Sequence, residues 1–236
     1  MYTVFIISWT VLATVIFGIT IIATSFLSRT GNLPHRIAAL WARTILFVSR
    51  IRVKVKGFYN IDPSRSYIYM PNHQSLYDIP VLLSHLDVQF RWLAKKELFN
   101  IPIFGQAMKR IGYISIDRSN RKSAFESLGK AAEIIRNGVS VLIFPEGTRS
   151  KDRTLIPFKK GGFVLAVDSG VPIVPIIIHG TGEIMPKKEM LIRHGNVLLE
   201  IKQPIETSEY SRKNKDDLME TVRKVICDAF EQGRKA

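Results

Sequence analysis

Two residues within the segment 71–78, His73 and Asp78, are of the types that general acid–base chemistry uses. In a continuous helix, a separation of five residues would place their side chains about 140° apart, too far to meet. Across a turn between a strand and a helix they can meet, and the carboxylate would then fix the tautomer of the imidazole and raise its basicity. Two other interpretations stay open: Ser75 and Asp78 fit a helix capping box, and a single loop histidine is commonly only solvated.

Two further turns carry charged side chains at the ends of expected strands. The segment 112–118 ends in Asp117 and Arg118, and the planar guanidinium group of an arginine suits a phosphate. The segment 144–150 follows the most apolar strand of the chain. It contains a glycine, which permits close approach of the backbone to a ligand, and Arg149, which could clamp an anion. The alternative for both segments is an ordinary charged turn at the surface.

The elements that would position these residues follow from the hydrophobic pattern. It predicts a single α/β domain over residues 51–236, in which helices flank a largely parallel central sheet. Ligand-binding turns of such a sheet lie at the carboxyl ends of its strands, so we expect the charged turns to meet there. The predicted strands are 52–56, 66–70, 89–94, 113–116, 139–144, 173–178 and 197–201, and the predicted helices are 76–85, 101–110, 122–136, 162–168 and 218–230.

The first 28 residues of the chain contain no charged side chain. As a helix, residues 2–27 would be roughly 40 Å long, which is enough to cross a bilayer with tilt. A cleaved signal peptide would need a positive start and a small-residue cleavage site, and neither is evident. We therefore expect residues 1–50 to form two membrane-associated helices. The basic residues after the first helix would keep the domain on the cytoplasmic side.

The second of these helices carries Arg36, Arg43 and Arg50 at intervals of seven residues, with mostly apolar residues between them. On a helix, such a spacing places the three arginines in one narrow stripe. The helix could pack on the domain with its arginines in water, or it could lie at the membrane surface with the arginines among anionic headgroups. The adjacent apolar helix favours the second arrangement.

Composition narrows the classes of protein and partner. The chain has 236 residues, a formal net charge of +14 and 46% hydrophobic residues, which excludes a disordered chain. Its single cysteine, Cys227, excludes an intrachain disulfide and a cysteine-rich metal site. No Gly-x-Ser-x-Gly elbow, Walker A loop or zinc-ligand spacing occurs in the sequence. The positive charge suggests anionic partners, and the uncharged N-terminus and dispersed basic residues favour lipid over nucleic acid.

Four blocks of the sequence, taken in order, resemble the glycerolipid acyltransferases, and within them the bacterial 1-acyl-sn-glycerol-3-phosphate acyltransferases of the PlsC type. His73 to Asp78 matches the His-x4-Asp motif of that family, with the usual Asn72 before it. The other blocks are 95–118, the Phe-Pro-Glu-Gly-Thr-Arg-Ser run at 144–150, and the Val-Pro-Ile-Val-Pro-Ile run at 171–176. One block alone is weak evidence, whereas four in order at plausible separations are strong evidence. The resemblance covers nearly the whole chain.

The resemblance implies transfer of an acyl group from acyl-CoA or acyl carrier protein to the sn-2 hydroxyl of lysophosphatidic acid, which gives phosphatidic acid. His73 would take the proton of the hydroxyl while Asp78 holds the imidazole. No covalent intermediate, cofactor or metal is implied. Membrane lipids would be partners, at the cytoplasmic face of the inner membrane. Acylation of glycerol-3-phosphate or another lysolipid stays an alternative, and a non-enzymatic basic membrane-binding protein is a more distant one.

The resemblance also implies a set of substrate-binding residues. The cationic members would hold the phosphate, Glu146 would orient a basic side chain or a substrate hydroxyl, and Gly147 would let the backbone approach the substrate. Lys96 could replace Lys95 as the phosphate ligand, although the spacing of Lys95 to Pro102 fits the family pattern better. The expected substrate-binding residues are Lys95, Arg118, Glu146, Gly147, Thr148 and Arg149.

Overall fold

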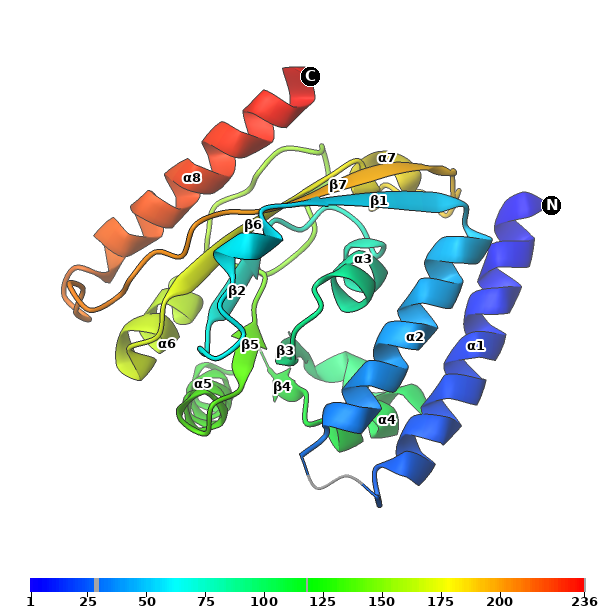
Figure 1. Ribbon diagram of the computed structural model, residues 1–236, viewed down its shortest axis with the longest axis horizontal. Helices are drawn as coiled ribbons and strands as arrows, with labels where there is room; N and C mark the ends of the chain where they lie inside the picture. The colour runs from blue at the N-terminus through cyan, green and yellow to red at the C-terminus, as the bar shows by residue number, and fades with distance from the viewer. Residues whose placement is uncertain (28–29, 118, 236) are drawn as a thin grey trace.

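The computed structural model of the protein describes residues 1–27, 30–117 and 119–235 (Figure 1). Its strands are β1 (Ile51–Lys56), β2 (Ile68–Pro71), β3 (Phe90–Lys95), β4 (Ile114–Ile116), β5 (Ser140–Leu142), β6 (Ile173–His179) and β7 (Gly195–Ile201). Its α-helices are α1 (Tyr2–Thr24), α2 (Asn32–Val48), α3 (Asp78–His85), α4 (Phe104–Ile111), α5 (Arg121–Arg136), α6 (Gly161–Ser169), α7 (Thr181–Ile184) and α8 (Lys215–Lys235). Two 3₁₀ helices, η1 (Phe58–Asn60) and η2 (Lys96–Asn100), complete the described elements.

The described strands form one sheet in the order β1-β7-β6-β2-β5-β3-β4. Every adjacent pair is parallel except β6 and β7, which are antiparallel. The predicted α/β fold with a largely parallel sheet is therefore confirmed. The central strand β2 is buried along its whole length, as is typical of a strand covered by helices on both faces.

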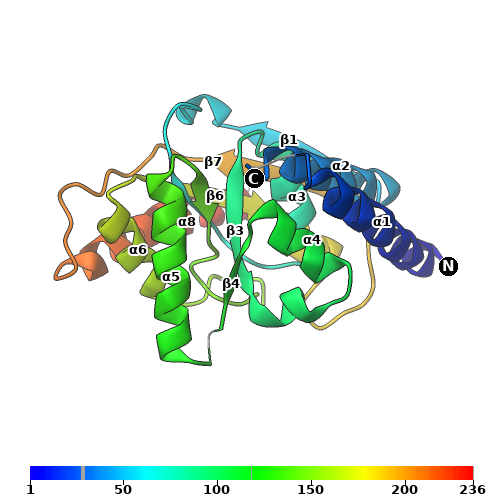
Figure 2. The same ribbon diagram turned by 90° about the horizontal axis from the view of Figure 1, so that it is seen from below.

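Successive side chains of β2 and its flanking residues point to opposite faces of the sheet, which divides the core into two layers. Tyr67 and Tyr69 pack in the cluster that contains apolar side chains of α2 and α3. Ile68 and Met70 pack in the other cluster, with side chains of α5, α6 and α8. Figures 1 and 2 show these two sets of helices on opposite sides of the sheet.

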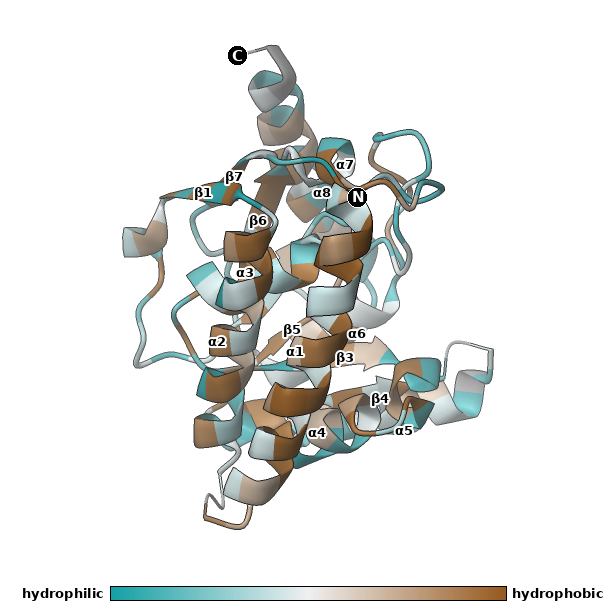
Figure 3. Ribbon diagram, turned by 90° about the vertical axis from the view of Figure 1, so that its right-hand side faces the viewer, coloured by the Kyte–Doolittle hydropathy of each residue, from teal (hydrophilic) through white to brown (hydrophobic). Residues whose placement is uncertain are grey.

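The two N-terminal helices form an antiparallel pair that packs on the rest of the molecule (Figure 1). The indole Nε1 of Trp41 in α2 donates a hydrogen bond of 3.1 Å to the hydroxyl of Thr14 in α1, and α1 also packs on α4. By length and composition, α1 can cross a membrane, and most of its residues are not buried by the protein. Figure 3 shows the hydrophobic residues along this helix.

The sequence of helix α2 allows it either to pack on the domain or to lie at a membrane surface, and the structure has features of both arrangements. Its small and aliphatic residues are buried against neighbouring helices, among them Ala38, Ala42 and Leu46. Arg36 and Arg43 are exposed on the helix, whereas Arg50 is exposed beyond its end, with a φ of 46°, so the expected helical stripe holds two arginines and not three. Three large apolar side chains of the same helix are also exposed, namely Leu33, Leu40 and Phe47. Packing on the domain therefore leaves a mixed basic and apolar stripe free for a membrane surface.

Element boundaries differ from the predicted ones where the backbone leaves regular geometry. The helix expected over 101–110 begins at Phe104, because Ile103 has a φ of 60°, outside the right-handed helical region. The strand expected over 139–144 is regular only over Ser140–Leu142. Helix α7 and the two 3₁₀ helices are too short to produce a periodic pattern, and the sequence did not predict them.

Candidate active site

Four neighbouring strands, β2, β3, β5 and β6, run in parallel, so the turns that follow them lie at one edge of the sheet. A cavity of about 480 Å³ opens at this edge. Its polar wall comes from those turns and includes His73, Lys95 and Arg149. Its apolar wall comes from α1, α2 and α4, which contribute side chains such as Phe17, Trp41 and Met108. The cavity therefore joins a polar, cationic end to an apolar end.

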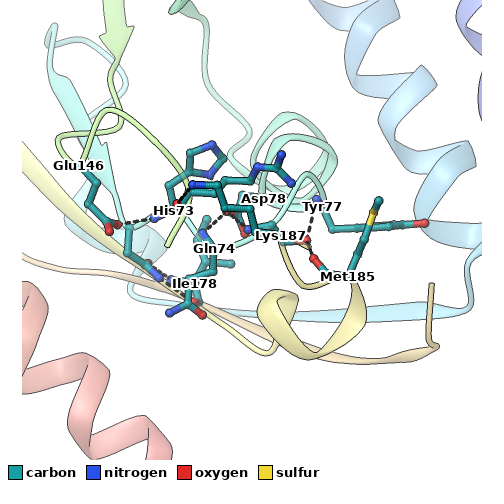
Figure 4. A network of polar contacts seen from close by, with 11 residues as sticks. His73, Gln74, Tyr77, Asp78, Glu146, Ile178, Met185 and Lys187 are labelled. Carbon is teal, nitrogen blue, oxygen red and sulfur yellow. Dashed lines mark hydrogen bonds and ion pairs between the residues drawn. The ribbon is translucent and has the colours of Figure 1, made fainter. Parts of the chain in front are cut away.

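His73 and Asp78 meet across the turn between β2 and α3. The Nδ1 of His73 lies 2.7 Å from Oδ2 of Asp78, which is fully buried (Figure 4). The imidazole stacks on the ring of Phe144, with the ring centroids 3.7 Å apart and the planes at 13°. This contact and the carboxylate fix the orientation of the ring, which lines the cavity and keeps 14% of its side chain exposed.

The same carboxylate oxygen also binds the backbone at the start of α3. Oδ2 of Asp78 accepts hydrogen bonds from the N–H groups of Gln74 at 2.8 Å and Ser75 at 2.9 Å. Asp78 therefore contacts His73 and the backbone of the turn at the same time, but the expected capping box is incomplete, because the N-cap of α3 is Tyr77 and no side chain caps it. Because an ionised carboxylate can only accept hydrogen bonds, this contact fits the imidazole tautomer with its proton on Nδ1, in which Nε2 has a lone pair that can accept a proton.

The backbone of His73 is held from two sides by the turn after β5. Its N–H donates to Oε1 of Glu146 at 2.7 Å (Figure 4), and its carbonyl accepts from the N–H of Ser150 at 2.9 Å. The side chain of Asn72 binds the backbone N–H and carbonyl of Ile178 in β6. These hydrogen bonds link the ends of β2, β5 and β6 around His73, so the sheet fixes the position of the histidine.

Glu146 differs from its expected role. Its carboxylate is fully buried, and its two oxygens accept hydrogen bonds from the backbone N–H groups of His73 and Ile156 instead of contacting a basic side chain or the cavity. Burial raises the pKa of Glu146 to about 7, against the opposing effect of these two donors. Glu146 therefore positions the backbone under His73, a role that its charge in the sequence does not reveal.

The expected phosphate ligands occupy different places. Arg149 and Lys95 both line the cavity, and the Nζ of Lys95 forms an exposed ion pair of 3.0 Å with Glu97. Lys96 faces away from the cavity and pairs with Asp117 at 3.2 Å, so the pleat at the end of β3 separates the two neighbouring lysines. Arg118 lies outside the described residues.

The turn after β5 brings its glycine and threonine to the cavity. Gly147 has a φ of 73°, in the left-handed region that favours glycine, and lines the cavity beside Thr148. The Thr148 hydroxyl accepts a hydrogen bond of 3.2 Å from Lys187. The structure thus brings five of the six expected substrate-binding residues to this edge of the sheet, four of them in the cavity wall and Glu146 beneath it.

Comparison with known proteins identifies the family. The family described as Acyltransferase matches residues 52–179, which is more than half of the chain. The chain belongs to the acyltransferase family. The 1-acyl-sn-glycerol-3-phosphate acyltransferase BAT2, chloroplastic, of Brassica napus is 42% identical over 173 residues, which cover 72% of this chain and 50% of that protein. The human 1-acyl-sn-glycerol-3-phosphate acyltransferase alpha is 31% identical over 198 residues, covering 84% and 70% of the two chains.

A solved acyltransferase structure has the same fold over the whole chain. The crystal structure of PlsC, the 1-acyl-sn-glycerophosphate acyltransferase of Thermotoga maritima, superposes with a TM-score of 0.84 at 29% identity. The superposition covers 100% of this chain and 95% of that one. By contrast, this acyltransferase spans about half the length of the plant chloroplast relatives that it matches.

Sequence reasoning missed a cationic residue of the acyltransferase cavity. Lys187 lies beyond the fourth matched block, on the chain that follows β6 and α7 (Figure 4). It lines the same cavity as His73 and Arg149. No motif marks it in the sequence. The signal that could have found it is topological: β6 is parallel to β2, so the chain after β6 returns to the same edge of the sheet.

Proposed function

We propose that this acyltransferase transfers an acyl group from a thioester to the sn-2 hydroxyl of lysophosphatidic acid and so forms phosphatidic acid. The observation that carries the proposal is the position of the His73–Asp78 pair at the junction of a cationic and an apolar wall. The cationic wall suits the phosphate of a lysophosphatidic acid, and the apolar wall suits the acyl chain that is transferred to its hydroxyl. The names of the relatives support the same substrate.

His73 acts as the general base in the proposed reaction. Its Nε2 removes the proton of the hydroxyl as the oxygen attacks the thioester carbonyl, and Asp78 stabilises the imidazolium that forms. The tetrahedral intermediate then expels the thiolate, which takes the proton from His73. The products are the ester and a free thiol, and the histidine returns to its starting form. Asp78 accepts two backbone N–H bonds throughout, so its carboxylate does not have to reorient.

The phosphate of the acceptor would bind Arg149 and Lys95, and the acyl chain of the donor would occupy the apolar wall. The ion pair of Lys95 with Glu97 does not prevent this, because both side chains are mostly exposed and solvent weakens such a pair. Acyl-CoA and acyl carrier protein both present the thioester that the reaction needs. Acylation of glycerol-3-phosphate is the second candidate, since the cationic wall would bind its phosphate equally well.

The enzyme would work at the cytoplasmic face of the inner membrane. Helix α1 can enter the bilayer, and the exposed arginines of α2 would lie among anionic headgroups next to it. Because α1 also forms part of the cavity wall, this placement would bring the opening of the cavity to the lipid substrate.

The test is an acylation assay with the purified full-length protein in vesicles. Labelled acyl-CoA is supplied with lysophosphatidic acid, lysophosphatidylcholine or glycerol-3-phosphate in turn, and the products are identified by mass spectrometry. We expect phosphatidic acid as the main product. The His73→Ala variant should lose roughly 10²–10⁴-fold in kcat, while His194→Ala, which changes an exposed histidine outside the cavity, should not. A preference for glycerol-3-phosphate, or normal turnover by His73→Ala, would contradict the proposal.

A further inference from the structure

Lys187 lies on a segment that is fixed to both walls of the active site. At one end of the segment, the carbonyl of Met185 accepts a hydrogen bond of 2.8 Å from the hydroxyl of Ser75, in the turn that carries His73 (Figure 4). At the other end, the N–H of Ile192 donates to the hydroxyl of Thr3 in α1 at 3.2 Å. The segment therefore connects the turn of the general base to the N-terminus of the membrane helix, and Lys187 has a defined position between them.

The ammonium group of Lys187 is held over the turn that contains Arg149. Its Nζ donates to the carbonyl of Arg149 at 2.6 Å and to the hydroxyl of Thr148 at 3.2 Å. An ammonium group has three N–H donors, so these two bonds leave one donor for a ligand. Because Lys187 lines the same cavity as His73, that ligand would be a group bound in the active site.

The charges around Lys187 are of one sign. Desolvation lowers the pKa of Lys187, and so do three neighbouring cations, the side chains of Lys151, Arg149 and Lys188. Within the described part of the chain, no carboxylate forms an ion pair with Lys187 or with Arg149. Cations gathered without a counter-charge repel one another, and a bound anion would relieve that repulsion. The part of the cavity wall formed by Lys187 and Arg149 is therefore complementary to a group that carries negative charge, whereas Lys188 lies outside that wall.

We infer that Lys187 binds a phosphate group of a substrate together with Arg149. Arg149 would hold the phosphate from the turn after β5, and Lys187 would hold it from the segment that is hydrogen-bonded to that turn. The inference rests on the proposed function, because it assigns a ligand within the same active site. The phosphate has two possible sources of the same chemistry, the headgroup of the lysolipid or the 3′-phosphate of coenzyme A. Charge-assisted hydrogen bonds from lysine and arginine suit both.

The decisive experiment compares steady-state kinetics of three variants of the full-length protein with both substrates varied. Lys187→Met removes the charge and keeps the length of the side chain, Lys187→Arg keeps the charge, and Lys188→Met is the matched control on the exposed neighbour. We expect Lys187→Met to raise KM for one substrate by about tenfold, equivalent to ~1.4 kcal/mol, with little change in kcat. Lys187→Arg should recover most of the loss, and Lys188→Met should resemble the wild type.

The substrate whose KM rises identifies the source of the phosphate. A rise confined to lysophosphatidic acid assigns Lys187 to the headgroup, and a rise confined to acyl-CoA assigns it to the nucleotide. A loss of kcat with both KM values unchanged, without recovery by arginine, would overturn the inference, because it would indicate that Lys187 only supports the turn of Arg149.

A second measurement separates this inference from the proposed reaction. Lysine amines of the wild-type protein are acetylated with and without glycerol-3-phosphate or free coenzyme A, and the modified lysines are quantified by mass spectrometry. We expect one of these ligands to reduce the labelling of Lys187 and leave that of Lys188 unchanged. Unaltered labelling of Lys187 with both ligands would overturn the inference, whatever acceptor the enzyme uses. Protection of Lys187 in a protein that acylates no lysolipid would instead contradict the proposed function alone.

Discussion

The two walls of the cavity are built in different ways. The polar wall consists of short turns at the ends of parallel strands, and buried side chains such as Asn72, Asp78 and Glu146 hold the backbone of these turns with hydrogen bonds. The apolar wall consists of helices from separate parts of the chain that meet through side-chain packing. Hydrogen bonds fix direction and distance, whereas apolar contacts are non-directional. The wall that must place reacting atoms is therefore the one fixed by hydrogen bonds.

Close helix packing sets the shape of the apolar wall. Gly18 of α1 faces Ile103 at the start of α4, and a Cβ at Gly18 would lie 2.6 Å from Cγ2 of that isoleucine. The small residues Ala38 and Ala107 belong to the cluster that joins α1, α2 and α4. These positions let the helices approach one another and leave the remaining space to the cavity. Replacing these small residues with larger ones should change which acyl chains fit in the cavity. Substitutions in the polar wall should instead affect phosphate binding and the local backbone.

After the loss of kcat expected for His73→Ala, the largest effect is expected at the charged end of the polar wall. Arg149→Ala should raise KM for the lysolipid by roughly 10–150-fold, because a hydrogen bond to a charged group contributes about 1.5–3 kcal/mol. KM for the acyl donor should change much less. The measurement is a full kinetic matrix in which both substrates are varied, with Arg153→Ala as the control on an arginine outside the cavity wall. An equal rise for both substrates would count against a phosphate contact.

A smaller effect should appear in the stability of the polar wall as a function of pH. The pKa of Glu146 is raised to about 7 in the folded protein, above its ordinary value of 4.5. Between these two values the native state binds a proton that the unfolded state lacks, so this group makes the free energy of unfolding fall as pH rises, and the effect is constant above about pH 7.

Glu146→Gln stays neutral at every pH, so its stability relative to the wild type should improve by roughly 1–3 kcal/mol between pH 5 and pH 8. Chemical unfolding of both proteins in the same detergent at the two pH values measures this difference. Glu133→Gln, which changes an exposed glutamate of α5, is the control and should show no such trend. An unchanged difference between wild type and Glu146→Gln across this range would show that the carboxyl group does not titrate there.

The smallest effect concerns the apolar wall. Ala38→Leu places three additional carbons in the wall and should shift the preference toward shorter acyl chains, with each excluded methylene costing ~0.8 kcal/mol, about fourfold in kcat/KM. Ala39→Leu, on the same helix but outside the cavity wall, is the matched control. Competition among acyl-CoA chains of different length measures the preference. A uniform loss with every chain length would indicate general overpacking instead of a shorter cavity.

The local sequence predicted which residues of this protein do chemistry better than it predicted which groups their side chains contact. The spacing of His73 and Asp78 predicted two side chains that could meet across a turn, and the apolar strand before residue 144 predicted a turn fixed by the sheet. Both inferences depend only on the order of neighbouring residues. The role of Glu146 could not be predicted in this way, because its partners are backbone groups of residues 73 and 156, brought close by the pairing of strands.

The sequence by itself determined the alternation of strands and helices, the apolar N-terminal helix and the turns that carry His73 and Arg149, because periodicity and turn composition act over a few residues. Only the tertiary structure decided that Lys95 and not Lys96 lines the cavity, that Lys187 joins Arg149, and that α1 closes the apolar wall. These outcomes depend on the direction in which each strand of the sheet runs and on which helices meet. Contacts between residues far apart in the chain leave no local pattern in one sequence.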